Sequence, residues 1–227
     1  ITGVGFSPDL VILKKRSGGS NRSTCLYDTK RGATKLLHPT GTNAEETQNA
    51  GLTAFDSDGF SLGSDDATNG SGNAYVAWCW KEGNDPGFAI YSWTGNGNNN
   101  TSFGHSLGAK PAFMIIKRRD STDNWMVYHK HLGSGSSLEL NETSQSGGGK
   151  WSGTEPTTTH FTVSSDASVN ASGGTYVGYL FAEVEGFSNF GYYEGIGGGH
   201  SDDHIGALNP ARPPYVYTGF EPAFVMI

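Results

Sequence analysis

The sequence lacks the features that define several protein classes. It holds only two cysteines, Cys25 and Cys79, which are too few for a disulfide framework. No window of about 12 residues carries the apolar stripe of an amphipathic helix, and no apolar run has the length of a membrane span or a signal peptide. Charged residues make up 16% of the chain, with a net charge of -7. This acidic balance argues against a nucleic-acid partner, and the missing span against a membrane partner.

Catalytic motifs are also missing. The sequence shows no nucleophile elbow, no phosphate-binding loop and no cysteine–histidine pair. Four glutamates, Glu139, Glu142, Glu183 and Glu185, could supply a glycosidase pair, but their spacing along the chain does not place two carboxylates across a cleft. We therefore predict a protein that is not an enzyme and has no cofactor.

Glycine and aromatic residues are what the sequence has in quantity. Glycine accounts for 34 of the 227 residues, and aromatics for 12%. Clusters of Gly, Asn, Ser and Thr separate short runs of large side chains, a pattern typical of strands joined by tight turns. The fold class predicted is all-β.

A repeated stretch dominates the chain. Residues 69–80 and 170–181 each combine an Asn- and Gly-bearing turn with a strand of large side chains. Asn69 and Asn170 are 101 residues apart, as are Tyr75 and Tyr176. Because the strand is bulky on both faces, we expect it to be central and covered on both sides. The retained Asn and Gly favour a turn that fixes the backbone before that strand.

A second repeated element sets the number of units. A proline opens an apolar strand that ends in a basic cluster at residues 8–16 and again at residues 111–119, and a third such strand starts at Pro222. Each period offers about six or seven strands, which suits a small sandwich. We predict two tandem antiparallel β-sandwich repeats, lectin- or jelly-roll-like, of about 101–103 residues. The predicted units are residues 1–87 and 88–189. Residues 190–227 are predicted to start a third period or to complete the first or second sandwich, within a longer parent protein.

The same repeated residues carry a resemblance to a family. The shared pattern comprises residues 94–97, 105–108, 111–119, 125–129, 170–176, 181–188 and 217–220. On this pattern the chain resembles a domain family of unassigned biochemistry found in virion proteins of tailed bacteriophages. The second unit matches closely; the first matches loosely, since it lacks the tryptophan at Thr24-Cys25-Leu26.

The resemblance implies a structural and adhesive role in the virion. The expected place is a tail fibre, spike or other surface appendage, the expected partners are other virion subunits, and the expected assembly is a homo-oligomer, a trimer by analogy. Contact with a host surface glycan would serve attachment. Two alternatives stay open: a carbohydrate-binding module of a secreted bacterial protein, and a capsid decoration protein.

Two sites stand out as candidates. His200, Asp202, Asp203 and His204 could bind a divalent ion such as calcium, although a solvated surface loop is the stronger explanation. Trp151 lies outside a clear strand, so we expect an exposed aromatic that contacts glycan. Lys14–Arg16 and Lys117–Arg119 could bind an anion or form solvated strand ends. The sequence Asp56-Ser57-Asp58-Gly59 starts like an EF-hand loop but has Ala67 where the bidentate glutamate belongs.

Overall fold

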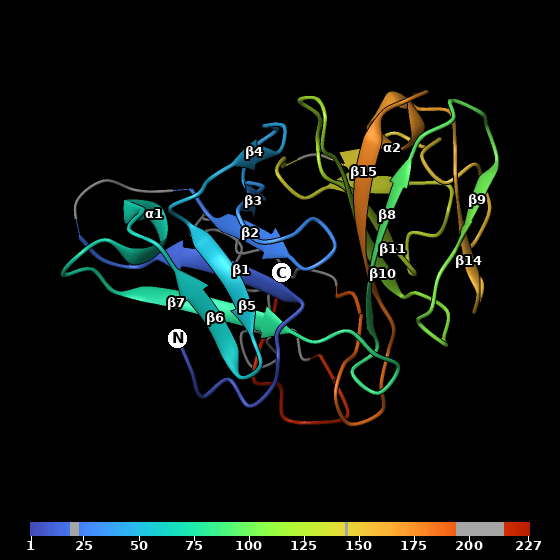
Figure 1. Ribbon diagram of the computed structural model, residues 1–227. Coiled ribbons are helices and arrows are strands. Elements are labelled where there is room, and N and C mark those ends of the chain that lie inside the picture. Colours follow the sequence, from blue (N-terminus) through green and yellow to red (C-terminus); the bar gives the residue numbers. More distant parts are fainter. Residues whose placement is uncertain (19–22, 144, 194–215) are drawn as a thin grey trace, which may run out of the picture.

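The computed structural model describes residues 1–18, 23–143, 145–193 and 216–227, and it is all-β as predicted (Figure 1). The first half of the chain contains β1 (Leu10–Lys15), β2 (Cys25–Asp28), β3 (Lys35–Leu36), β4 (Glu46–Thr47), β5 (Leu52–Asp56), β6 (Gly59–Leu62), α1 (Asp66–Asn69) and β7 (Tyr75–Trp80). The second half contains β8 (Phe88–Thr94), β9 (Thr101–Gly104), β10 (Phe113–Arg118), β11 (Met126–His129), β12 (Ser137–Glu139), β13 (Gln145–Ser146), β14 (His160–Val163), α2 (Ala167–Asn170) and β15 (Thr175–Phe181). All strand pairs are antiparallel.

Each half has one large sheet, and the two large sheets correspond strand by strand. The second half forms the order β13-β12-β11-β10-β15-β8. The first half forms β2-β1-β7, and a bridge between Leu26 and Leu37 joins the β3–β4 ladder to β2. Five strands therefore match in order. The sixth strand, β8, follows β7 in the chain but pairs with β15 of the second half.

A small sheet covers the outer face of each large sheet. In the second half β9 pairs with β14, and Phe103 lies opposite Phe161. In the first half β6 pairs with β5 on one side. On its other side Ile1 exchanges backbone hydrogen bonds with Phe60. Ile1 thus occupies the position that Phe103 holds in the second half.

Three hydrophobic cores stack through the molecule. The first lies between β5–β6 and the first large sheet and contains Val11, Leu13, Cys25, Tyr27, Leu36, Leu52 and Phe60. The third lies between the second large sheet and β9–β14 and contains, among others, Trp93, Met114, Tyr128, Trp151, Phe161 and Tyr176. Each half is therefore a sandwich built from alternate side chains of its strands.

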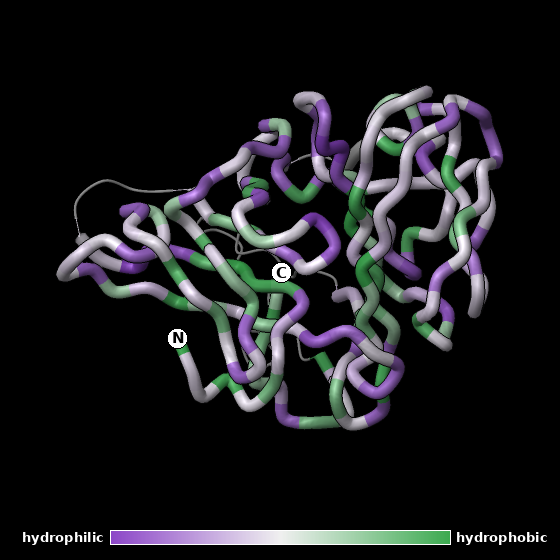
Figure 2. The backbone as a smooth tube through the Cα atoms, in the orientation of Figure 1, coloured by the Kyte–Doolittle hydropathy of each residue, from purple (hydrophilic) through white to green (hydrophobic). Residues whose placement is uncertain are grey.

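The second core joins the halves, and we call it the central core. Its buried members are Leu10, Leu26, Leu37, Phe88, Ile90, Trp125, Val177 and Tyr179. In Figure 2 the hydrophobic parts of the tube run along β1 in one half and along the facing strands of the other. β15 contributes to this core and to the third core, so it is buried on both faces, as its bulky sequence predicted. For its counterpart β7 the same prediction is wrong, because β7 is half-buried or exposed at every position and pairs only with β1 in the described part of the chain.

The repeated turn is held by the same contacts in both halves. The Tyr176 hydroxyl donates to Ala167 O at 2.7 Å and accepts from Ala171 N at 2.7 Å. The Tyr75 hydroxyl donates to Asp66 O at 2.6 Å and accepts from Gly70 N at 2.8 Å. Each tyrosine thereby ties the start of its strand to the preceding single helical turn, which explains why the stretch recurs in both halves.

The described part of the chain contains no helix long and apolar enough to cross a membrane, because α1 and α2 are single turns of four residues.

Candidate functional site

Trp151, the expected glycan contact, is a core residue. Its side chain is 1% exposed, and its indole N–H donates to Ser136 O at 3.0 Å. The ring packs edge to face against Tyr128 in the third core. The prediction of an exposed aromatic is wrong, because a tryptophan outside a strand can still turn inward where a buried carbonyl accepts its N–H.

The predicted metal ligands His200, Asp202, Asp203 and His204 lie outside the described residues. Within the described ranges, no group of three or more His, Cys, Asp or Glu side chains is arranged to hold a metal ion. Asp58, from the EF-hand-like turn, instead accepts hydrogen bonds from the backbone N–H groups of Gly3 and Gly5, at 3.0 Å and 2.6 Å.

The second basic cluster, Lys117–Arg119, makes its contacts within the protein. Lys117 is fully buried, and its ammonium group donates to the backbone oxygens of Thr42, Arg118 and Ser121. Burial lowers the pKa of Lys117 to about 8. Arg118 pairs with Asp120 at 3.1 Å. These groups are therefore occupied and do not form an anion site.

Charged groups also link the two halves beside the central core. Arg31 binds Asp28 at 2.5 Å, with both side chains fully buried, and the Tyr179 hydroxyl donates to Asp28 at 2.6 Å. Glu45 accepts from Arg31 at 3.2 Å and from Arg119 at 2.9 Å. Burial alone would raise the pKa of the Glu45 carboxyl, but the hydrogen bond from Arg119 and the charge of Arg31 lower it. The network holds both halves in one arrangement.

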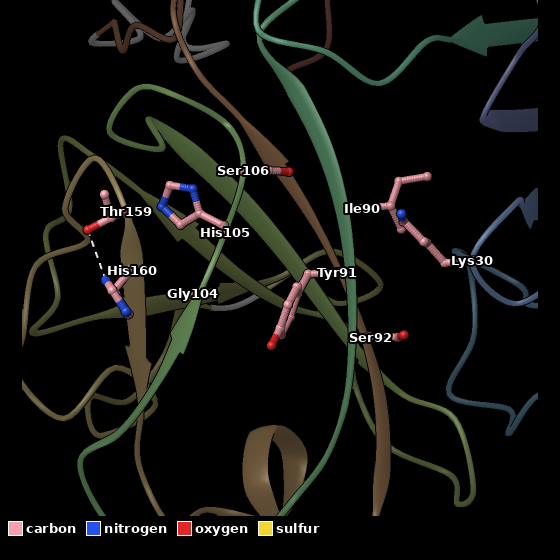
Figure 3. A pocket seen from close by; sticks show the side chains of 9 residues that line it. All are labelled: Lys30, Ile90, Tyr91, Ser92, Gly104, His105, Ser106, Thr159 and His160. Atoms are coloured by element: carbon pink, nitrogen blue, oxygen red, sulfur yellow. Dashed lines mark hydrogen bonds between the residues drawn. The ribbon is translucent and has the colours of Figure 1, made fainter.

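The candidate site is a shallow depression of about 640 Å³ over the outer edge of β8. It is lined by Lys30, Ile90, Tyr91, Ser92, Gly104, His105, Ser106, Thr159 and His160. Figure 3 shows Tyr91 and the two histidines on one side of β8, and Ile90, Ser92 and Lys30 on the other. Lys30 comes from the first half and the remaining residues come from the second. A ligand here would contact both halves.

The two histidines of the depression differ in availability. His105 Nδ1 lies 3.3 Å from Leu107 N, which donates to it, so Nε2 carries the proton and donates to Thr157 O at 3.2 Å. Burial, together with the nearby His160, lowers the pKa of His105 and keeps it neutral. His160 is exposed and bonds the Thr159 hydroxyl through Nδ1 at 2.8 Å. Its second nitrogen has no partner among the residues described, so it can contact a ligand.

Tyr91 gives the depression an aromatic surface. Its ring is half-buried and packs on Trp93, Phe103 and Phe161, with centroid distances of 5.9, 6.0 and 5.8 Å. This support fixes the ring orientation at no further cost on binding. The phenol hydroxyl makes no hydrogen bond to any described residue. Ser92, the next residue of β8, is exposed on the opposite side of the strand. The depression thus presents one rigid aromatic ring and several hydroxyl and imidazole groups.

Comparison with known families places the whole chain in one of them. Residues 1–227 match the model of a domain of unknown function (DUF7483). The chain belongs to this family. No curated protein and no solved structure matches it. The DUF7483 chain therefore has to be interpreted from its own geometry.

The sequence did not single out the depression. Nothing in the sequence distinguishes Tyr91 from the other aromatics, and its neighbours His105 and His160 are 55 residues apart in the chain. The register of β9 and β14, with Gly104 opposite His160, brings the histidines together. The sequence repeat did not indicate the depression either, because the described part of the first half has no strand equivalent to β8.

Proposed function

We propose that this DUF7483 chain is a structural and adhesive protein of a tailed-bacteriophage virion, in a tail fibre, spike or other surface appendage. The resemblance of its repeated motifs suggests the setting. The three stacked cores and the buried Asp28–Arg31 pair support a rigid component. Such a component would act through binding and assembly with other virion subunits, as a homo-oligomer, rather than through catalysis.

One observation carries the adhesive part of the proposal: the depression on β8 combines a supported aromatic ring with unsatisfied polar groups. Sugar rings are bound by stacking on an aromatic face while hydroxyls exchange hydrogen bonds with side chains. Tyr91 supplies the ring, and His160, on the same side of β8, supplies a polar atom. The openness of the depression fits a terminal sugar or short chain on a host surface better than a small molecule enclosed on all sides.

The test of the adhesive role is a glycan array probed with the purified 227-residue chain and two variants. We expect Tyr91→Ala to lose binding to the glycans that the wild type retains. Tyr217→Ala, which removes an aromatic that is 78% exposed and does not line the depression, is the control and should bind normally. Absence of wild-type binding, or equal loss in both variants, would count against a glycan site at Tyr91.

The virion setting needs its own test, because the same depression also suits a carbohydrate-binding module of a secreted bacterial protein. Gold-labelled antibody raised against the chain should decorate the tails of phage particles produced by a host that carries the gene. Labelling over the capsid shell would favour a decoration protein. Recovery of the antigen only from the culture medium, free of particles, would favour the secreted module.

A further inference from the structure

Among the described residues, β7 pairs only with β1, and its outer edge pairs with no other strand. Arg16 N donates to Ala74 O at 2.8 Å, and this fixes the alternation along β7: the backbone groups of Val76 and Trp78 point toward β1. The N–H and C=O groups of Tyr75, Ala77 and Cys79 therefore point away from β1. These groups have no hydrogen-bond partner in residues 1–18, 23–143, 145–193 and 216–227.

The corresponding edge in the second half is filled. Tyr176, Gly178 and Leu180 of β15 lie opposite Trp93, Tyr91 and Ala89 of β8. β15 is buried at five consecutive positions, whereas every residue of β7 is half-buried or exposed. An open edge of this kind is a template for an added antiparallel strand. The chain itself thus shows what a filled edge looks like.

The chain also contains a second segment whose sequence resembles the start of β8, the strand that fills this edge in the second half. Residues 190–193 follow β15 much as β8 follows β7, and their sequence Phe-Gly-Tyr-Tyr parallels Phe-Ala-Ile-Tyr at residues 88–91. In the β8–β15 register, Phe190 would lie opposite Trp80, and Tyr193 opposite Ala77. Tyr91 likewise faces a small residue, Gly178. Tyr192 and Tyr193 are 69% and 46% exposed, so both are accessible to a partner.

We propose that the edge of β7 binds residues 190–193 of a second copy of the chain as an antiparallel strand. Within one copy, the Phe190 ring stacks on Phe113 at 5.5 Å and Phe190 N bonds Glu183. These contacts hold the start of the segment against β10 and the loop that follows β15 in the same copy. The edge and the added segment lie on different parts of each copy, so the contact is head-to-tail, and repeated contacts close a ring or extend a row of copies. This goes beyond glycan contact, because it assigns an assembly surface.

A disulfide trap tests the register and the source of the strand together. Gly191 would lie opposite the native Cys79, at the separation of paired antiparallel residues, which a disulfide can span. Gly191→Cys should therefore oxidise to covalent dimers and larger species joined through Cys79, as mapped by mass spectrometry. The wild type, whose other thiol Cys25 is fully buried, is the control. A link within one chain, or none to Cys79, would overturn the proposal.

Sedimentation equilibrium provides the second arm. The wild type should show a mass that rises with concentration. Ala77→Pro removes an outward N–H and should weaken association at least about tenfold. Ser92→Pro is the matched control, since it removes an outward N–H from the edge of β8, and it should associate like the wild type; thermal unfolding verifies that both variants fold. A wild-type mass that stays at 24.1 kDa at every concentration would overturn the proposal.

Discussion

Asn170 shows how much one buried amide can organise. It is fully buried, and its side-chain nitrogen donates to Asn96 Oδ1, Asn98 O and the Thr101 hydroxyl, while its oxygen accepts from Asn96 N. Asn170→Ala leaves several of these groups unpaired, so we expect the free energy of unfolding to fall by about 2–3 kcal/mol in urea titrations. Its repeat counterpart Asn69 is exposed, and within the part of the chain that the structure describes its side chain bonds only Gly63 O. Asn69→Ala should cost less than about 1 kcal/mol, and equal losses would contradict this assignment.

Lys117 should make stability depend on alkaline pH. Its pKa is lowered by burial from 10.5 to about 8. Between these values the unfolded chain binds a proton that the folded chain has released, so the stability of the wild type should rise with pH in this window. We expect the wild type to gain stability from pH 8 to pH 10 relative to Lys117→Met, in urea titrations at both pH values. Lys110→Met, at an exposed lysine, is the control and should track the wild type. A difference that does not change with pH would contradict the assignment.

At the scale of the elements, the loop around Trp151 is the one for which the prediction from the sequence, an exposed aromatic, was wrong. Trp151→Ala should lower the free energy of unfolding by about 3–5 kcal/mol, because it empties a site in the third core and leaves Ser136 O without its donor. Scanning calorimetry measures this loss. Glycan binding per folded molecule should be unchanged. A stable Trp151→Ala protein that selectively loses glycan binding would restore the original hypothesis.

The sequence repeat made most strands predictable. The exception is β8, which has no counterpart in the described part of the first half, and the features that depend on its pairing were missed. The strand of residues 175–181 and its turn could be predicted because large residues alternate on both faces and Asn and Gly recur at the same spacing. The pairing of β8 with β15 could not, since sequence adjacency favours β7 as its partner. The burial of Trp151 and Lys117 depends on carbonyls supplied by distant loops. The depression depends on the same long-range pairings.

At the scale of the molecule, the two sandwiches are joined into one body. β8 follows the last strand of the first half in the chain and completes the large sheet of the second half, and the central core packs both large sheets together. The Arg31–Asp28–Tyr179 contacts and the Glu45–Arg119 pair cross the same boundary. Either half alone would expose the apolar face of its large sheet, so we expect the halves to depend on each other for stability.

Hydrogen exchange measured by mass spectrometry along a urea gradient tests this interdependence most directly. Because the two halves depend on each other, we expect β1 and β10, at the centres of the two large sheets, to open with the same free energy in one cooperative step. Val177→Ala, in the central core, should lower both values together by about 2 kcal/mol. Opening of β1 at a lower urea concentration than β10, or a Val177→Ala effect confined to the second half, would contradict the account.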